Sequence, residues 1–202
     1  MPRTGRPREF DADAALEQAK DLFWTRGYAA TSIPDLLETL SIQRGSLYAA
    51  FGDKQSLFLK ALALYVRQSE EHLERLLAVE PVLPALRAAL SDPVGLIDES
   101  LSTAQDGARG CLVANSAVEV APFDEAARAV ITAAHAGTVR ILSDALERAQ
   151  AAGEARTDAT PEAQARMLLL LMQGYGVVAR TGVDTAPLVA AIQLAVDGLR
   201  AS

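Results

Sequence analysis

The sequence predicts an all-α protein of about nine helices, with a small N-terminal helix-turn-helix unit followed by a larger helical body. Half of the 202 residues are hydrophobic, which argues against a disordered chain. Alanine and leucine dominate over β-branched residues, and no segment sustains the alternation of a β-strand. Apolar residues instead recur at the spacing of amphipathic helices.

Three short helices are predicted near the N-terminus, each with its own start and stop signals. The first is ended by Gly27. The second begins after Thr31 and Ser32, both good N-caps, and ends at Ser41, where a tight turn leads into the third. The predicted bounds are about residues 11–26, 33–40 and 43–50.

Such a trio is the pattern of a helix-turn-helix unit. The outer face of its last helix must be small and polar to enter a DNA major groove about 12 Å wide. The third helix meets this demand, and Tyr48 lies at its flank. Its outward positions are Gln43, Arg44, Gly45, Ser46, Ala49 and Ala50.

The rest of the chain is also predicted to be helical. A long helix begins at Lys54 and ends near residue 77, and prolines divide residues 80–104 into one broken helix or two. Residues 105–110 are expected to form a loop and residues 153–160 a turn. Four more helices are expected over about residues 111–119, 122–151, 161–180 and 185–201.

Charge is uneven between the two predicted domains, residues 1–54 and 55–202. The formal net charge is −7, and all of it lies beyond residue 60. This asymmetry suits an N-terminal domain that faces a polyanion and an acidic C-terminal domain, although it is also common in proteins that never contact DNA. The N-terminal arm either enters a DNA minor groove or is a frayed terminus; its basic residues are Arg3, Arg6 and Arg8.

Several classes of protein are disfavoured. No apolar run reaches the roughly 18–20 residues needed to cross a bilayer, so we expect a cytoplasmic protein without membrane contact. The single cysteine, Cys111, cannot form an intrachain disulfide, which fits a reducing compartment. Histidine and cysteine lack metal-ligand spacing, and no glycine-rich phosphate loop is present. We therefore expect no enzyme activity, no metal and no cofactor.

The segment GYAATSIPDLLETLSIQRGSLYAAFGDKQSLFLKAL, residues 27–62, resembles the DNA-binding signature of the TetR family of transcriptional regulators. The elements TGRPREFD and RGCLVANSAVE are similar to those of a subgroup of these repressors. The resemblance implies an N-terminal DNA-binding domain and a C-terminal helical domain for effector binding and dimerisation. Ala49 and Ala50 depart from the bulky polar residues that the family often carries, which limits readout there to apolar contact with thymine methyls.

The resemblance also implies roles for single residues. Tyr48 and Lys54 would hold phosphates, and Thr31 would anchor the start of the second helix to the DNA backbone. Alternatively, Tyr48 is a rim aromatic, Arg44 a solvated charge, and Lys54 a lysine without a partner. The expected contacts from the recognition helix, to bases or phosphates, are Gln43, Arg44, Gly45 and Ser46.

The last two predicted helices are apolar around their full circumference. Residues 167–172 read MLLLLM, and the final helix carries Ile192 and Leu194 among other apolar residues. A helix of this kind must be buried on more than one face. Either it is a central core helix of a monomer, or its second face meets another copy; the resemblance implies a homodimer with a four-helix interface, and we expect Leu170 and Ile192 to lie in it.

The resemblance places a small-molecule effector in a cavity between the fourth helix and those that follow. A lone histidine such as His72 is more often structural, and Asn115 could equally make a helix-packing hydrogen bond. Cys111 is either a sensor of electrophiles or oxidants, favoured by a helix N-terminus and by Arg109, or a small buried hydrophobe. The candidate pocket residues are Cys111, Asn115, His135, Gln173 and Tyr175.

These observations predict a transcriptional repressor that a small, apolar effector releases from a pseudo-palindromic DNA operator. The alternative is a helical dimeric ligand sensor that acts through protein partners without binding DNA. Gly45, Tyr48 and Lys54 of the DNA-binding signature are intact, which favours the repressor.

Overall fold

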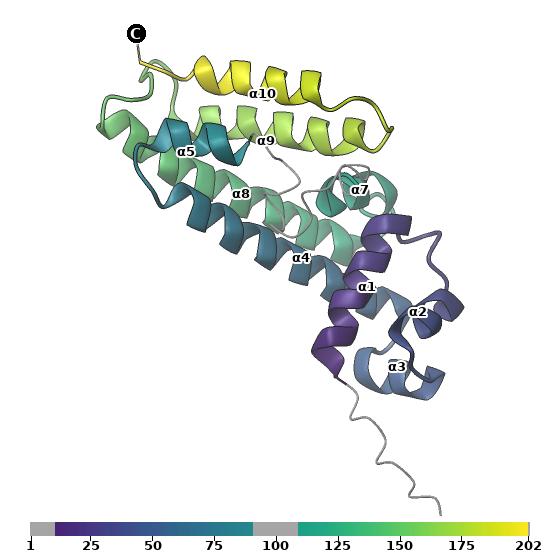
Figure 1. The fold of residues 1–202 in the computed structure, drawn as a ribbon. Helices are drawn as coiled ribbons and strands as arrows, with labels where there is room; N and C mark the ends of the chain where they lie inside the picture. Colours follow the sequence, from purple (N-terminus) through teal and green to yellow (C-terminus); the bar gives the residue numbers. More distant parts are fainter. Residues whose placement is uncertain (1–10, 91–108, 202) are drawn as a thin grey trace, which may run out of the picture.

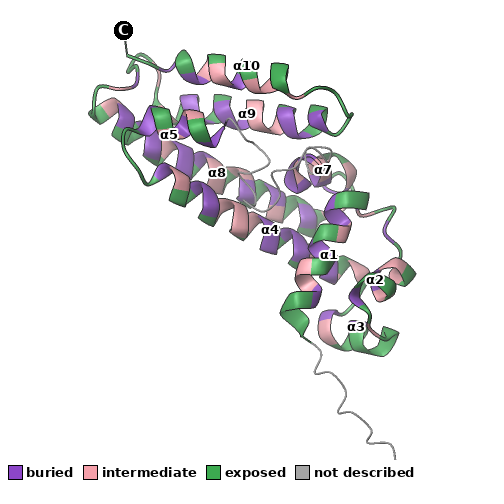
Figure 2. Ribbon diagram, viewed as in Figure 1, coloured by how far each residue is buried: buried purple, intermediate pink, exposed green. Residues whose placement is uncertain are grey.

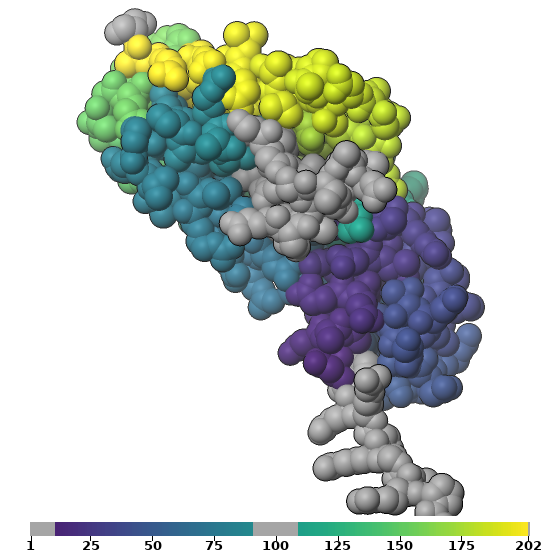
Figure 3. Space-filling view, in the orientation of Figure 1, coloured from purple at the N-terminus to yellow at the C-terminus, as the bar shows by residue number. Residues whose placement is uncertain are grey.

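The computed structural model describes residues 11–90 and 109–201, and in this part of the chain it contains nine α-helices and no β-strand (Figure 1). The predicted all-α fold is therefore confirmed. The predicted basic arm and the stretch between residues 90 and 109 lie outside the described residues. In the space-filling view, residues 11–51 form one end of an elongated molecule (Figure 3).

The N-terminal end, which we call the head, consists of α1 (Ala12–Arg26), α2 (Ile33–Leu40) and α3 (Arg44–Phe51). Ser32 and Asp35 cap α2 reciprocally. The Ser32 hydroxyl accepts from the Asp35 N–H at 3.2 Å, and the Asp35 carboxylate accepts from the Ser32 N–H at 2.8 Å. Local signals of this kind explain why the predicted helix bounds agree closely with the structure.

The remaining helices form the body. Their N-caps are local as well: the Asp53 carboxylate accepts from the Ser56 N–H at 2.7 Å, and Thr160 caps a later helix in the same way. The helices are α4 (Lys54–Leu77), α5 (Val82–Ala89), α7 (Leu112–Glu119), α8 (Glu125–Ala151), α9 (Pro161–Ala179) and α10 (Ala186–Asp197).

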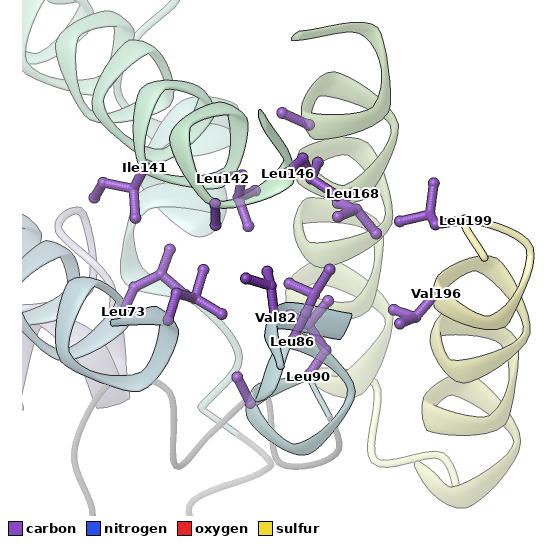
Figure 4. Packing of buried hydrophobic residues seen from close by; sticks show 14 of the residues in the cluster. Leu73, Val82, Leu86, Leu90, Ile141, Leu142, Leu146, Leu168, Val196 and Leu199 are labelled. Atoms are coloured by element: carbon purple, nitrogen blue, oxygen red, sulfur yellow. The ribbon is translucent and has the colours of Figure 1, made fainter. Parts of the chain in front are cut away.

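Two clusters of buried apolar residues follow one another along the molecule (Figure 2). The first fills the head and reaches α7 and the start of α8. The second fills the body, where α4, α5, α8, α9 and α10 meet (Figure 4). Because α4 contributes Phe58 to the first cluster and Leu73 to the second, the domain division at residue 54 stays a prediction.

Helices α9 and α10 each keep an apolar face outside the body core. Leu170 on α9 and Leu194 on α10 are 73% and 74% exposed. In contrast, Ile192 is only 2% exposed and packs in the body core near Val196. The prediction of a second apolar face is thus confirmed, but the expectation that Ile192 lies on that face is wrong.

Candidate nucleic-acid interface and effector cavity

The outer face of α3 is open, because its two large apolar residues point inward. Leu47 is fully buried and Phe51 is 5% exposed, and both belong to the head core. A Cβ added at Gly45 would meet nothing within 4 Å, so a partner could approach the backbone closely there. The predicted contact residues on α3 and at its N-cap are all exposed, with Tyr48 at 44%; they are Gln43, Arg44, Gly45, Ser46 and Tyr48.

Lys54 begins α4 beside this face, and its ammonium group is held by an aromatic ring. The Nζ atom lies 4.3 Å from the centre of the Tyr28 ring, within the range of a cation–π contact. Partial burial lowers the pKa of Lys54, whereas the nearby Glu119 carboxylate acts in the opposite direction. The lysine therefore has an internal partner, which the sequence did not indicate.

Thr31 is placed differently from the expectation. Its side chain is fully buried, and its hydroxyl donates to the Gly27 carbonyl at 2.7 Å. Its own N–H donates to the Tyr28 carbonyl. In this structure the Thr31 hydroxyl is committed to an internal acceptor and stabilises the turn before α2, and its contact with the DNA backbone stays a prediction.

A cavity lies between α4, α7, α8 and α9, and four of the five predicted pocket residues line it: Cys111, His135, Gln173 and Tyr175. The His135 Nε2 atom is buried there with no hydrogen-bond partner among the described residues. The fifth, Asn115, does not line this cavity; its amide donates to the Arg109 carbonyl at 2.9 Å. His72 is buried and lies beside Arg75, away from the cavity lining.

The sequence placed the cavity beside the fourth helix, but the residues of α4 that line it were not predicted. Burial raises the pKa of the Glu70 carboxyl, and it raises that of the Tyr65 phenol well above the usual value, with Cys111 as a further cause. The Tyr65 hydroxyl accepts from the Leu112 N–H at 3.2 Å. A polar stripe on one face of α4 was the available signal; its members in the lining are Tyr65, Ser69 and Glu70.

Arg109 and Cys111, which the sequence paired, each have a neighbour of their own in the structure. The Arg109 guanidinium lies over the Trp24 ring, 5.5 Å from its centre. Cys111 is the N-cap residue of α7, is partly buried, and makes no side-chain capping bond. Cys111 thus lines the cavity, while the guanidinium of Arg109 packs on Trp24 of the head.

A three-helix unit with an open recognition helix, set on a helical body that contains a cavity, defines a helix-turn-helix regulator. The model for "Bacterial regulatory proteins, tetR family" matches residues 15–61. The model for "Tetracyclin repressor-like, C-terminal domain" matches residues 85–195. The chain belongs to the TetR family.

Similar proteins extend over nearly the whole chain. The transcriptional repressor ComR of Escherichia coli is 34% identical over 179 residues, which cover 88% of this chain and 83% of ComR. A structure of the TetR regulator CifR with 26-bp operator DNA is 32% identical, with a TM-score of 0.81, and covers 96% of this chain and 100% of that chain. Reduced Escherichia coli NemR, at 20% identity and a TM-score of 0.80 over 95% of this chain and 97% of that chain, supports the fold alone.

Among the described residues, no helix combines the length and the apolar character required to cross a membrane. Because the family consists of transcriptional regulators, the chain is assigned as a regulator and not as an enzyme.

Proposed function

We infer that this protein is a DNA-binding transcriptional repressor that acts as a homodimer and responds to a small effector. The observation that carries the inference is the outer face of α3, which the fold leaves exposed, small and polar. A sensor without DNA binding, the alternative function, would have no need for this face. A gel-shift assay with the DNA upstream of its own gene tests the assignment directly.

The operator is expected to be pseudo-palindromic, because a two-fold dimer presents two copies of α3 about one DNA turn, roughly 34 Å, apart. Binding should weaken steeply as salt rises, since phosphate contacts release counterions. Titrations at several salt concentrations measure this slope. Binding that is independent of salt, or equal on palindromic and scrambled duplexes, would contradict the assignment.

In the proposed complex, Tyr48 and Lys54 contact phosphates, while exposed side chains of α3 contact bases or phosphates. Thr31 contributes indirectly, by holding the turn before α2. The proposed α3 contacts are Gln43, Arg44 and Ser46, with Gly45 allowing close approach. Because a repressor must reach its operator DNA, we also assign the protein to the cytoplasm.

The proposed dimer interface joins α9 and α10 of each subunit. Each helix has one face in the body core and a second apolar face in solvent, which a partner copy would cover. The exposed apolar residues of this region are Met167, Leu170, Val177, Val178, Val183 and Leu194.

The proposed effector site is the cavity lined by Cys111, His135, Gln173 and Tyr175. Among the described lining residues, the walls are apolar apart from these groups, the α4 stripe and Thr138, so an apolar molecule with a few polar atoms suits the cavity. The effector would release DNA only through its differential affinity for a body conformation that misplaces the heads. Operator DNA would then weaken effector binding by the same factor.

Cys111 offers a direct test of the cavity. N-ethylmaleimide should modify this single thiol and place a bulky group among the lining residues, lowering operator affinity by about tenfold. The Cys111→Ser protein is the control and should keep its affinity after the same treatment. If Cys111 resists the reagent, or if its modification leaves operator affinity unchanged, the thiol serves only packing.

A further inference from the structure

One short segment, residues 109–119, connects the cavity to the head. It consists of α7, its N-cap residue Cys111 and the two residues before Cys111, and we call it the α7 link. Its first part belongs to the cavity, because Gly110 and Cys111 are lining residues. Helix α9 packs tightly against it there. A Cβ added at Gly176 would lie 2.7 Å from the Cys111 Cβ. The link therefore cannot move toward α9, and a ligand that widens the cavity between them must push the link away from α9.

The first part of the link is also fastened to α1. The indole Nε1 of Trp24 donates to the Gly110 carbonyl at 2.9 Å in a fully buried hydrogen bond. The Trp24 ring packs edge-on against Tyr65, with ring centres 5.2 Å apart. Trp24 is the single tryptophan of the chain, so its fluorescence reports on this junction.

The last residue of the link holds the turn between α1 and α2. The Glu119 carboxylate accepts from the Tyr28 N–H at 3.1 Å and from the Ala29 N–H at 2.8 Å. Hydrogen bonds to an ionised acceptor are stronger than neutral ones. The same turn carries the Tyr28 ring, on which Lys54 rests. Glu119 thus helps to position Lys54, the lysine assigned to a DNA phosphate, through Tyr28.

We propose that Glu119 is a positioning residue for the DNA site, and that the α7 link transmits cavity occupancy to the head through it. This rests on the proposed function, in which a cavity ligand controls DNA binding. Because α7 is a single short helix, displacement of its N-terminal end at Cys111 also displaces the carboxylate at its other end. The Tyr28 turn then loses both acceptors, and Lys54 loses its fixed place.

Gly176→Ala imitates a ligand without requiring one, because the added methyl presses on Cys111. Gly174→Ala is the control on the same helix, since a Cβ there meets nothing within 4 Å in its own subunit. Gly174 is exposed near Leu170, on the face of α9 assigned to the dimer, so sedimentation must first show that this control is still a dimer. In DNA-free Gly176→Ala protein, hydrogen exchange of the Tyr28 and Ala29 amides should accelerate and Trp24 emission should shift. Operator affinity should fall about fivefold to tenfold, with the dimer intact by sedimentation. The control should behave as wild type in all four measurements.

Glu119→Ala tests the other end of the link. Removal of a negative charge alone favours binding to polyanionic DNA, so Glu125→Ala, which removes an exposed carboxylate at the start of α8, is the charge control. Operator affinity should fall about fivefold to tenfold in Glu119→Ala and stay equal or rise in Glu125→Ala. A rise in both variants would mean that Glu119 acts only as a charge, which would overturn the proposal.

The double mutant Gly176→Ala, Glu119→Ala decides whether the two ends act together. The double mutant should bind the operator no less tightly than the single mutant with the lower affinity, because either substitution alone already interrupts the α7 link. Additive losses, or unchanged exchange at Tyr28 and Ala29 in Gly176→Ala, would overturn the proposal while leaving DNA binding established. If exchange responds but wild-type protein binds no upstream DNA, the proposed function fails and the mechanical link stands.

Discussion

Leu170→Glu should convert the protein into a folded monomer that no longer binds its operator. Leu170 is 73% exposed on α9, so a glutamate there is solvated and harmless in a single subunit. In the proposed α9–α10 interface, the same carboxylate would be buried without a partner, at a cost on the order of several kcal/mol. The head is untouched, yet one head alone cannot span two half-sites. Sedimentation equilibrium and operator titration measure both effects.

Ile192→Glu supplies the contrast that makes this test specific. Ile192 is 2% exposed within the body core, so a glutamate there should unfold the subunit. Leu194→Glu, at an exposed position of α10, should instead repeat the Leu170→Glu result. Circular dichroism separates the two outcomes. An intact dimer in both the Leu170→Glu and Leu194→Glu proteins would place the interface elsewhere on the molecule.

Ile192 is buried and Leu194 is exposed on the same helix, and the sequence alone could not distinguish them. Helix bounds depend on local chemistry, such as the Ser32–Asp35 capping box, and these were predicted closely. The phase of an amphipathic helix is also local, because polar residues mark the outer face. In α10, apolar residues occupy both faces, so periodicity cannot distinguish the face toward the core from the face toward a partner.

The site was predictable to a similar degree. Residues of α3 face outward because Leu47 and Phe51 face inward, and this follows from their spacing. Thr31 could not be placed, because its acceptor is the carbonyl of Gly27 in a turn of unknown geometry. Glu119 bonds to amides about ninety residues away, and no local pattern indicates such a contact.

A Lys54→Ala, Tyr48→Phe double mutant should lose operator affinity without losing the fold. Tyr48 is 44% exposed at the flank of α3, and Lys54 begins α4 beside it, so each can hold a phosphate. A hydrogen bond to a charged group is worth about 1.5–3 kcal/mol, so each substitution should weaken binding by about tenfold or more. The loss should be the same on all sequences, and the salt slope should fall by about one in total, because only the lysine carries a charge that releases counterions.

Two further variants separate this effect from lost charge and from base readout. Lys60→Ala removes an equal charge from the exposed face of α4, where the ammonium is bonded to the Ala50 carbonyl at 3.5 Å, and it should cost much less affinity. Arg44→Ala should relax the preference for particular bases, by about 1–3 kcal/mol, if its guanidinium reads a base edge. Fluorescence anisotropy on the operator and on single-base variants measures both quantities. Neither side chain belongs to the head core, so the double mutant should stay folded. Wild-type affinity in the Lys54→Ala, Tyr48→Phe protein would therefore mean that other residues contact the phosphates.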